Sequence, residues 1–468
     1  MSGQAGGFDA HDRILVIGLG RSGLASCEVL RSRGATVYAT DEKDPAALHD
    51  AIGEVQRLGA TFVAPHDLQT IAATLTSAVL SPGVPLNNAL VRLVQRAHVP
   101  VYSEIEVAYR LGRAPIVAVT GTKGKTTTTA LIGHLFREAG RATRVGGNIG
   151  NPLIAETVQA SADDWIVAEV SSFQLEGIRS FKPRVAVLLN VEPDHLDRYH
   201  SMDEYSEAKF RIFSNQGPHD VFIGNLDDPV IAALAEGEGA MRIPSRAFWF
   251  ARAPHRMTTL YVRRGWITYA PSSGDPRPIE IMPVDEIPLL GAHNVSNVLA
   301  AVLAGLATGI DREVLRAGVR TFTSLPHRLQ TVAERDGIRF VDDSKATNPG
   351  AVVAALEALE GSPIVLIAGG KSKRADFAEM GAAIARRAKS AILIGEAADE
   401  IAATIDSPIV ERASSMDEAV EIARRRATAG DVVLLSPGCA SFDMFDSAEH
   451  RGDEFARAVS GETVGVNG

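Results

Sequence analysis

The segment PIVAVTGTKGKTTTTALIGHLFREAG, residues 115–140, decides the fold of this chain. Its apolar, β-branched run ends at Thr120, Gly121 and Gly124 follow, and a Thr/Ala/Leu-rich stretch typical of a helix begins at Lys125. A glycine turn between a strand and a helix lets backbone N–H groups approach phosphate oxygens at the positive end of the helix dipole. The segment therefore predicts an α/β unit that binds a phosphate group.

Two side chains of this turn suit nucleotide chemistry. The ammonium of Lys125 would lie on the terminal phosphates, and the hydroxyl of Thr126 would reach Mg²⁺. The strict Gly-x4-Gly-Lys-Ser/Thr pattern fails because Val119 stands where its first glycine belongs, although Gly121 supplies a shorter version of the turn. A purely structural turn with solvated lysines is the alternative. The residues that we predict to bind nucleotide phosphates are Gly121, Thr122, Lys123, Gly124, Lys125, Thr126 and Thr127.

Alternating apolar runs and helix-forming stretches extend the α/β pattern in both directions. RILVIGL near the start and SPIVLIAGG, SAILIGE and DVVLLSPG in the last third are predicted strands between Ala-rich helices. This rhythm is typical of parallel sheets covered by helices. Because 468 residues exceed what one hydrophobic core serves, we expect three domains. Their expected ranges are 1–103, 104–324 and 325–468.

Residues 245–290 differ from this rhythm. RAFWF, TTLYVRRGWITYA and IEIMPVDEIPLL predict short antiparallel strands, with Arg264-Gly265 as a turn. We expect a small β insert in the central domain, whose aromatic residues, Trp249 among them, pack within the sheet.

The composition excludes several classes of protein. The 47 basic and 57 acidic residues give a net charge of −10, which provides no general attraction to nucleic acid or acidic membranes. The two cysteines, Cys27 and Cys439, lie outside any Cys-x-x-Cys spacing, so neither a disulfide framework nor a zinc knuckle is expected. No signal peptide or membrane span is predicted, and residues 1 to about 10 are expected to be disordered. We expect a soluble cytoplasmic protein that binds neither nucleic acid nor membrane.

The motif Gly18-Leu19-Gly20-Arg21-Ser22-Gly23 follows a predicted strand and precedes a predicted helix. Asp41 stands about twenty positions further on, as in a dinucleotide fingerprint. The motif indicates a nucleotide or phosphate at this helix N-terminus without distinguishing NAD from a nucleotide-sugar. A purely structural turn also remains open.

Polar side chains at two strand ends form a candidate metal site. Glu169 ends the run WIVAE, and Asn190, Asp194 and His195 follow the run VAVLL. Because the carboxyl ends of parallel strands lie on one side of a sheet, Glu169 and His195 could bind Mg²⁺, or Mn²⁺ given the imidazole. Alternatively, His195 and its neighbours cap the following helix.

Further polar groups follow strands predicted in the last third of the chain. Lys345, Thr347, Lys373 and Ser441 would gather at one sheet edge, where cationic and hydroxyl groups suit a small substrate with two carboxylates. Scattered loop lysines are the alternative. The spacing alone predicts that Lys209, in MDEYSEAKFRIF, is a solvated helix lysine.

Taken in order, these motifs resemble the Mur ligase family over nearly the whole chain. The matching segments are GLGRSG, SPGV, TGTKGKTT, GGNIGNP, EVSSFQL, NVEPDHLDRYH, YSEAK, GAHNVSN, PHR, DDSKATNP, GGKSK and LSPGCASFDMF. DSKATN and SPGCASFD resemble the glutamate-adding branch of the family. We find no DNPR-like segment of the diaminopimelate-adding branch.

The resemblance implies a fold and a set of roles. It implies an N-terminal Rossmann-like domain for a UDP-sugar, a central P-loop-type ATPase with the small β insert, and a C-terminal Rossmann-like domain for an amino acid. Besides the phosphate loop, the implied ATP contacts are Asn294, Asn297, Arg328 and Asp343. Without the family, Asn294 and Asn297 would cap a helix or bind an adenine. The implied ligands of one or two Mg²⁺ ions, which Mn²⁺ could replace, are Thr126, Glu169, His195 and a carbamate on Lys209.

Two substrate sites are also implied by the resemblance. The UDP-sugar contacts are Gly18, Leu19, Gly20, Arg21, Ser22, Asp41, Glu42, Ser81, Pro82, Gly83 and Asn148. The D-glutamate contacts are Thr347, Lys373, Ser441 and Phe442. The catalytic residues are Lys125, Lys209, His195 and Lys345.

The implied activity is ATP-dependent addition of D-glutamate to UDP-N-acetylmuramoyl-L-alanine through an acyl phosphate, by a monomer. Two departures concern substrate affinity: Lys123 stands where many relatives carry Asn, and Ala448 where some place an aromatic residue. An NAD-dependent dehydrogenase fits GLGRSG with Asp41 but leaves the phosphate loop unused. A folylpolyglutamate-synthase-like ligase shares the loop but lacks GLGRSG. A nucleotide-gated binding module would bind ATP without forming an amide.

Overall fold

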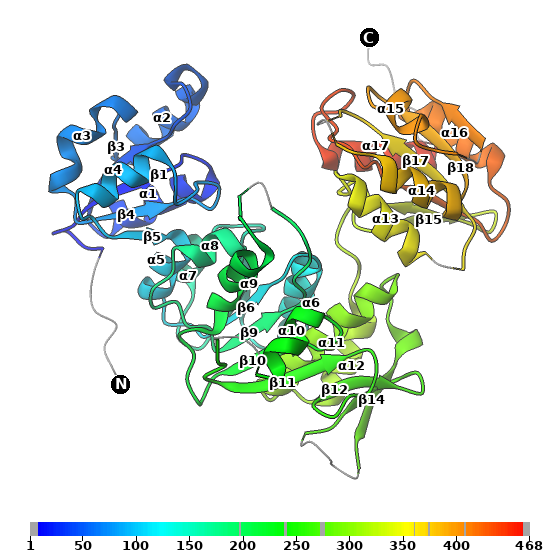
Figure 1. Cartoon of the computed structure of the whole chain (residues 1–468), viewed down its shortest axis with the longest axis horizontal. Coiled ribbons are helices and arrows are strands. Elements are labelled where there is room, and N and C mark those ends of the chain that lie inside the picture. Colours follow the sequence, from blue (N-terminus) through cyan, green and yellow to red (C-terminus); the bar gives the residue numbers. More distant parts are fainter. Residues whose placement is uncertain are drawn as a thin grey trace. The chain divides into compact units, whose positions relative to one another are not determined.

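The computed structural model describes residues 8–195, 198–237, 241–271, 277–359, 361–372, 375–406 and 409–461. The chain divides into two compact units, which are described separately. Unit 1 comprises Met1–Ile287 and Ser296–Phe322, and unit 2 comprises Pro288–Val295 and Thr323–Gly468. The described residues form three sheets, two in unit 1 and one in unit 2 (Figure 1). The α/β architecture is confirmed, while the domain boundaries at 103 and 324 stay predictions.

The first sheet of unit 1 is parallel, with the strand order β3-β2-β1-β4-β5 among the described residues. Its strands are β1 (Arg13–Ile17), β2 (Thr36–Thr40), β3 (Thr61–Phe62), β4 (Ser77–Leu80) and β5 (Val101–Ser103). The helices of this part are α1 (Arg21–Ser32), α2 (His49–Arg57), α3 (Leu68–Ile71) and α4 (Ala89–Arg96). Gly23 lets α1 pack on the loop after β1, because a Cβ there would lie 1.9 Å from the Gly18 carbonyl oxygen.

The N-terminal segment is ordered from Phe8 onward, which corrects the expectation of disorder to about residue 10. The Phe8 ring is 5% exposed and meets Tyr102 edge-on, with 6.1 Å between ring centres. The Phe8 backbone N–H donates to the Asp12 carboxylate at 2.6 Å. An aromatic side chain with a partner on β5 fixes this turn, and residues 1–7 lie outside the described residues.

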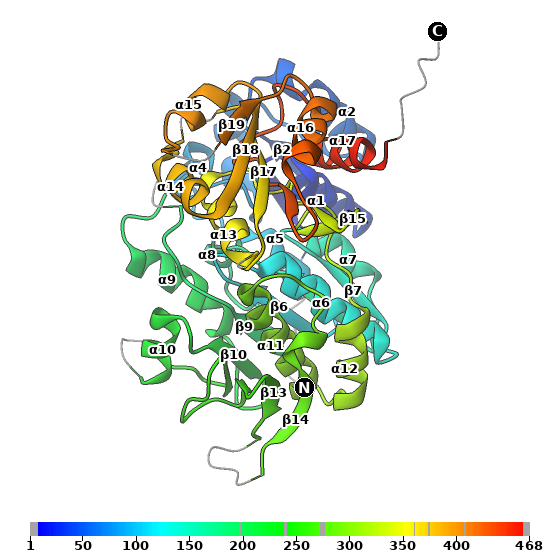
Figure 2. The ribbon, with the colours of Figure 1, turned by 90° about the vertical axis from the view of Figure 1, so that its right-hand side faces the viewer.

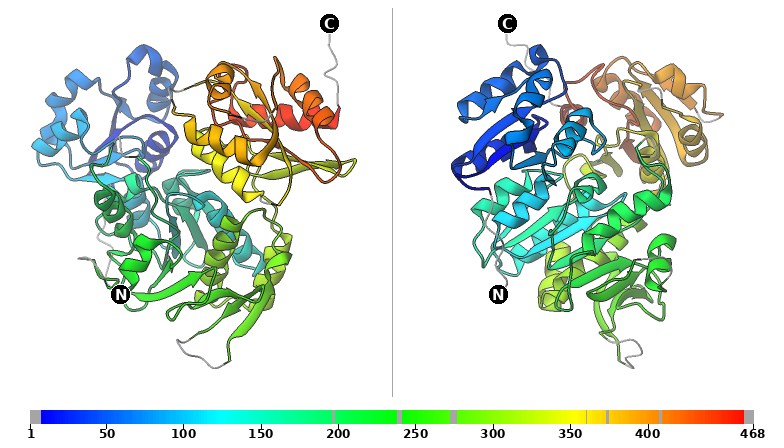
Figure 3. Two further views of the ribbon diagram at one scale, coloured as in Figure 1. Left: turned by 45° about the vertical axis from the view of Figure 1, so that its right-hand side comes forward. Right: turned by 60° about the vertical axis from the view of Figure 1, so that its left-hand side comes forward.

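The second sheet of unit 1 has the order β14-β13-β12-β11-β10-β9-β6-β8-β7 among the described residues. Its strands are β6 (Ile116–Thr120), β7 (Thr143–Gly147), β8 (Trp165–Glu169), β9 (Val185–Leu188), β10 (Val221–Asn225), β11 (Arg246–Ala251), β12 (Leu260–Arg263), β13 (Trp266–Tyr269) and β14 (Ile279–Pro283). Its helices are α5 (Glu104–Leu111), α6 (Lys125–Glu138), α7 (Leu153–Gln159), α8 (Ser172–Glu176), α9 (Met202–Phe210), α10 (Pro229–Ala235), α11 (Ala292–Ala307) and α12 (Arg312–Thr321). The cyan and green ribbons of Figure 3 show this sheet from two sides.

The predicted β insert continues this central sheet, and only part of it is antiparallel. β11 pairs in parallel with β10, and β12 in parallel with β11. Antiparallel pairing is confined to β12-β13-β14, where Arg264 (φ +52°) and Gly265 (φ +79°) form the predicted turn. The expectation for RAFWF was wrong because α10 connects β10 to β11 and returns the chain in the same direction. Trp249 is 8% exposed and packs within the sheet, as expected.

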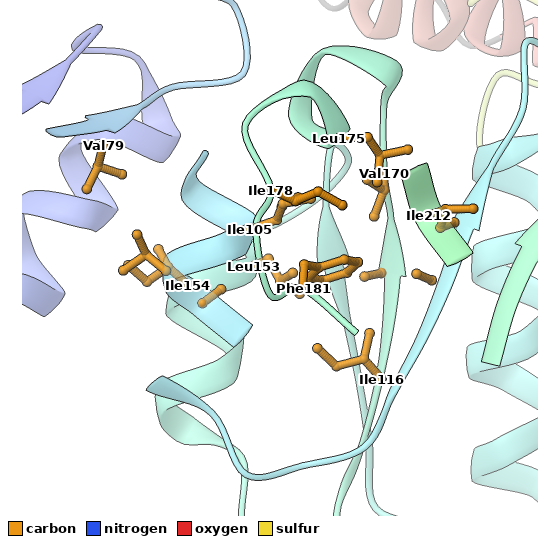
Figure 4. Packing of buried hydrophobic residues seen from close by; sticks show 14 of the residues in the cluster. Val79, Ile105, Ile116, Leu153, Ile154, Val170, Leu175, Ile178, Phe181 and Ile212 are labelled. Carbon is orange, nitrogen blue, oxygen red and sulfur yellow. The ribbon is translucent and has the colours of Figure 1, made fainter. Parts of the chain in front are cut away.

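One hydrophobic cluster joins both sheets of unit 1. It includes Val79 of the first sheet, Ile116 of the second, and Ile105 and Ile154 from α5 and α7 (Figure 4). Because buried apolar area is the main stabilising contribution, this shared cluster fixes the two sheets of unit 1 relative to each other.

Unit 2 contains the third sheet, with the order β15-β16-β20-β17-β18-β19 among the described residues. The strands are β15 (Gln330–Arg335), β16 (Ile338–Asp342), β17 (Ile364–Gly369), β18 (Ala388–Ile394), β19 (Ile409–Arg412) and β20 (Val432–Leu435). All described pairs are parallel except β15 with β16. One face packs on α13 (Pro349–Ala358), α14 (Ala378–Arg387) and α15 (Ala398–Ala402), and the other on α16 (Met416–Arg426) and α17 (Ala448–Ser460) (Figure 2). In the described part of the chain, no helix is long and apolar enough to cross a membrane.

Candidate active site

The phosphate loop, residues 120–126, joins the end of β6 to the start of α6. Gly124 precedes the helix with a left-handed φ of +79°, which favours glycine. A Cβ at Gly124 would also lie 2.4 Å from Oδ1 of Asn297 in α11. This Oδ1 accepts a hydrogen bond of 3.1 Å from the Thr128 hydroxyl. Asn297, for which the sequence left a helix cap or an adenine contact open, therefore lies against the phosphate loop.

Two ammonium groups donate to the same carbonyl oxygen of this loop. Nζ of Lys125 donates to the carbonyl oxygens of Gly121 at 3.0 Å and Thr122 at 2.8 Å. Nζ of Lys209, in α9, donates to the Gly121 oxygen at 2.9 Å and lies 4.4 Å from the centre of the Tyr205 ring. The structure therefore brings together two of the lysines that were candidates for catalysis.

Lys209 is 2% exposed, so the prediction of a solvated helix lysine was wrong. The buried positions of α9 are Tyr205, Ser206, Ala208 and Lys209, a mostly polar set that carries no apolar pattern. Burial first, and the ammonium of Lys125 second, lower the pKa of Lys209 from 10.5 to about 7, while Asp194 opposes the shift. A neutral amine is therefore accessible at Lys209 near pH 7.

Glu169 ends β8 beside the start of α6 and is 2% exposed. Its Oε2 accepts from the Thr126 hydroxyl at 2.8 Å, and its Oε1 accepts from Nδ2 of Asn148 at 2.9 Å. A carboxylate and a hydroxyl are hard oxygen ligands, so these two side chains fit Mg²⁺. A buried carboxylate whose contacts are a hydroxyl and an amide also favours a cation nearby.

His195 lies in a different setting from Glu169. Its ring centre is 4.8 Å from that of Phe173, and its backbone has a left-handed φ of +54°. The helix-cap alternative is wrong, because the Ser201 hydroxyl caps α9 by accepting from the Glu204 N–H at 3.2 Å. Among the described residues, no three His, Cys, Asp or Glu side chains are placed to hold a metal ion together. The pairing of Glu169 with His195 therefore stays a prediction.

A cleft of about 560 Å³ in unit 1 contains most of the residues predicted to bind the UDP-sugar. The predicted residues that line it are Gly18, Gly20, Arg21, Ser22, Asp41, Glu42, Ser81, Pro82, Gly83 and Asn148. Leu19 is buried, and its N–H donates to Oδ2 of Asp41 at 2.8 Å, so Asp41 holds the glycine-rich loop. The Ser81 hydroxyl fastens the same loop by donating to the Gly18 carbonyl at 2.7 Å.

Sequence reasoning missed other residues of this cleft, among them Lys43, Val84, Pro85, Asn88 and Gly147. The Lys43 N–H donates to the Asp41 carboxylate at 3.0 Å. Lys43 directly follows the predicted contacts Asp41 and Glu42, and this neighbourhood in the sequence could have identified it. The Asn88 side chain also caps α4 by accepting from the Leu90 N–H at 2.8 Å.

In unit 2, three loops meet at the carboxyl end of the sheet, and their binding of an amino acid stays a prediction. The Gly438 N–H donates to the Ala346 carbonyl at 2.9 Å, which joins the loops that carry Thr347 and Ser441. An antiparallel bridge between Lys371 and Ala440 adds the third loop. Lys373 lies outside the described residues.

Arg451, in α17, is a fully buried cation that sequence reasoning missed. Its Nε donates to the Ser344 hydroxyl at 3.0 Å, its Nη2 to the Ser344 carbonyl at 2.9 Å, and its Nη1 to the Cys439 carbonyl at 3.1 Å. The guanidinium thus clamps two of the three loops. Its contacts are neutral oxygens, and burial lowers its pKa to about 10. An arginine in a long polar helix gives no sequence signal for burial.

The remaining predicted site residues of unit 2 differ in their contacts and exposure. Lys345 forms an ion pair with Glu449, and the Phe442 ring is 68% exposed. Burial raises the pKa of Asp343 from 3.8 to about 7, and its carboxylate accepts from the Ser436 hydroxyl at 3.0 Å. Asn294 donates to the Leu290 carbonyl at 2.6 Å. The side chain of Arg328 lowers the pKa of Asp343, against the effect of burial.

Three family models match consecutive parts of the chain. Residues 12–103 match the Mur ligase MurD-like N-terminal domain, residues 119–305 the Mur ligase middle domain, and residues 327–439 the Mur ligase glutamate ligase domain. These matches follow the order of the three sheets.

Curated proteins are similar over nearly the full length. The chain is 45% identical to the UDP-N-acetylmuramoylalanine--D-glutamate ligase of Pelotomaculum thermopropionicum, over 96% of this chain and 97% of that protein. It is 42% identical to the protein of that name from Acidobacterium capsulatum, over 96% of each. Among solved structures, the MurF ligase of Thermotoga maritima with ADP has a TM-score of 0.60 at 17% identity, covering 92% of this chain and 96% of that one. MurC of Thermotoga maritima has a TM-score of 0.59 at 19% identity, over 97% of this chain and 100% of that one. These two structures share the fold.

Proposed function

This chain belongs to the Mur ligase family, and we propose that it adds D-glutamate to UDP-N-acetylmuramoyl-L-alanine with ATP, in peptidoglycan precursor synthesis. The observation that carries the proposal is the near full-length identity of 45% to a relative with that activity in its name. The convergence of Lys125, Lys209, Thr126 and Glu169 at one phosphate loop supports it chemically. We propose a monomeric cytoplasmic enzyme.

The reaction has two steps. The L-alanyl carboxylate attacks the γ-phosphorus of ATP, ADP leaves, and an acyl phosphate forms. The amine of D-glutamate then attacks the acyl carbon, loses a proton, and inorganic phosphate leaves. The Lys125 ammonium would move from the loop carbonyls to the transferred phosphoryl group, where it offsets charge that develops in the transition state. Exclusion of water matters because water would otherwise hydrolyse the acyl phosphate.

Mg²⁺ would be held by Thr126 and Glu169, with His195 and a Lys209 carbamate as further ligands. When bound, the ion supplies positive charge to the phosphate oxygens, and Mn²⁺ could replace it. The Asn148 amide holds Glu169 in place and also lines the UDP-sugar cleft. We infer that Asn148 fixes the position of the sugar-linked substrate relative to the metal ligand Glu169.

Carbamylation of Lys209 fits its surroundings. The reaction with CO₂ requires a neutral amine, and the lowered pKa of Lys209, about 7, provides one. A free ammonium would repel Mg²⁺, whereas a carbamate is an anionic oxygen ligand. After burial, the cation that lowers the pKa of Lys209 is Lys125, and a catalytic role for Lys345 stays a prediction.

The two substrates would bind in different units. We propose that the UDP part occupies the cleft of about 560 Å³ in unit 1, next to Asp41 and Ser81. D-Glutamate would bind at the loops of unit 2, through Thr347, Ser441 and the residues beside them. ATP would take the phosphate loop and Asn297, together with Asn294, Arg328 and Asp343.

The experiment is an assay of phosphate release with purified protein, MgATP, UDP-N-acetylmuramoyl-L-alanine and D-glutamate. Release should require both acceptor substrates, and a matching amide product should appear by mass spectrometry. L-Glutamate and omission of the UDP-sugar are the controls. Phosphate release without product would favour ATP hydrolysis alone, and hydride transfer from NADH to a substrate would favour the dehydrogenase alternative, which the three family matches do not support.

A further inference from the structure

The segment after β9 lies directly against the phosphate loop, and Asn190 makes the closest set of contacts. Its Oδ1 accepts from the backbone N–H groups of Thr122 and Lys123, both at 2.8 Å. Its Nδ2 donates to the Lys123 carbonyl at 3.2 Å. The Thr122 N–H also donates to the Asn190 backbone carbonyl at 3.1 Å. One side chain thus binds the backbone N–H and C=O of Lys123 and the N–H of Thr122.

Glu192, two residues further along, completes this junction. The Thr122 hydroxyl accepts from the Glu192 N–H at 3.0 Å and donates to the Glu192 carbonyl at 3.2 Å. The Lys123 ammonium pairs with the Glu192 carboxylate at 2.7 Å, although both side chains are about half exposed. Lys123 is one of the two positions at which this chain departs from the family pattern, and here its side chain joins the loop to Glu192.

The segment is itself held from behind by β10 and the turn that follows it. Nδ2 of Asn225 donates to the Leu189 carbonyl at 2.9 Å, and the Asp228 carboxylate accepts from the Val191 N–H at 2.8 Å. Asn225 and Asp228 are 7% and 6% exposed. Because these anchors are buried, Asn190 presents its amide from a fixed position.

The contacts divide the N–H groups of the loop into two sets. Those of Thr122 and Lys123 point toward Asn190. The first N–H groups of α6 lie at the positive end of the helix dipole, which is the end of a helix that binds anions. Because Asn190 holds the first half of the loop, the N–H groups at the start of α6 keep their direction when no nucleotide is bound.

We propose that Asn190 is a positioning residue that holds the phosphate loop in its nucleotide-binding shape before ATP arrives. The inference rests on the proposed function and adds a residue that acts through its contacts with the loop. Asparagine suits the task because its amide carries an acceptor and a donor on one plane. The sequence placed Asn190 among metal-site residues, whereas its oxygen is directed at two N–H groups of the loop.

The test compares Asn190→Ala and Asn190→Ser with Asn215→Ala as the matched control. Asn215 is partly buried, and its amide donates to the Phe181 carbonyl at 3.0 Å, so Asn215→Ala removes an amide contact elsewhere in unit 1. The measurements are KM for ATP, KM for the UDP-sugar, kcat, ATP affinity by calorimetry, and the rise in Tm caused by ATP.

We expect Asn190→Ala and Asn190→Ser each to raise KM and Kd for ATP about thirtyfold, equivalent to about 2 kcal/mol at about 1.4 kcal/mol per factor of ten. KM for the UDP-sugar should change less than threefold, and the ATP-induced rise in Tm should shrink. Asn190→Asp keeps the acceptor and should lie between wild type and Asn190→Ala. The control should keep the wild-type affinity for ATP.

The inference is overturned if a folded Asn190→Ala or Asn190→Ser variant binds ATP within threefold of wild type, or if Asn215→Ala weakens ATP binding equally. Asn190→Ser decides the question should Asn190→Ala fail to fold. An absence of amide product from the wild-type protein would refute the proposed function instead. The calorimetric comparison of ATP affinities would still judge the role of Asn190.

Discussion

Replacing Lys209 with methionine should stabilise the protein while abolishing its activity. Methionine keeps an unbranched side chain of similar length and removes the amine that is buried against the Gly121 carbonyl. Removing the amine ends any carbamate, so turnover should disappear. Removing a buried ionisable group should also remove the free-energy cost of burying its charge, which destabilises the wild-type protein.

The size of this cost follows from the pKa of Lys209, which is lowered from 10.5 to about 7. At about 1.4 kcal/mol per tenfold change in ionisation, the cost of burying the ammonium is roughly 5 kcal/mol below pH 7, where both folded and unfolded chains are protonated. Between pH 7 and 10.5 the unfolded chain binds more protons than the folded one, so the cost falls as pH rises. It is about 2 kcal/mol at pH 9. The lost hydrogen bond to Gly121 offsets about 1 kcal/mol of the gain.

The assay is urea unfolding of wild type and Lys209→Met at pH 6 and pH 9, in CO₂-free buffer so that the amine stays unmodified. The variant should unfold at higher urea at pH 6, and its advantage should shrink by about 3 kcal/mol at pH 9. Lys43→Met, at an exposed lysine, is the control for stability and should show neither effect. An advantage that is absent at pH 6, or equal at both pH values, would refute the reasoning.

Four further outcomes are expected in the phosphate-release assay. Lys125→Ala should abolish turnover, because its ammonium acts where charge develops in the transition state; turnover within tenfold of wild type would move the phosphate site elsewhere. Glu169→Ala should lose activity and recover part of it at high Mg²⁺ or Mn²⁺; a wild-type metal dependence would contradict its role. Lys209→Ala should be nearly inactive, with partial rescue by formate or acetate in the vacated space; full activity without either acid would exclude the carbamate. Arg451→Met should raise KM for D-glutamate at least tenfold and lower Tm, since it releases the Ser344 and Cys439 carbonyls; an unchanged KM would limit Arg451 to stability.

Short sequence patterns correctly predicted the elements that depend only on neighbouring residues. The strand, turn and helix at 115–140 lie where expected, because buried β-branched residues, glycines and a helix-forming run are neighbours in sequence. The direction of β11 was mispredicted, because strand pairing depends on a connection through α10 and on a partner elsewhere in the chain. Ordering at Phe8 depends likewise on Tyr102, which no short window contains.

The same distinction holds within the site. Loop glycines and the strand-end position of Glu169 were predictable, since each follows a recognisable strand. The burial of Lys209 and Arg451 was not, because a cation on a short or polar helix is indistinguishable in sequence from a solvated one. The role of Asn190 was hidden for another reason: its partners are backbone N–H groups, which carry no sequence identity.

The two ammonium groups on the Gly121 carbonyl impose an order on the events at this loop. While Lys125 stays on that oxygen, its charge helps to keep the Lys209 amine neutral, which is the form that reacts with CO₂. The phosphates of ATP bring negative charge to Lys125 and offset its positive charge. An uncarbamylated Lys209 would then gain a proton and become a cation facing Mg²⁺. We therefore expect that, if Lys209 is carbamylated, the reaction with CO₂ precedes nucleotide binding, an order that the proposed role of Asn190 would allow because its contacts hold the loop without phosphates.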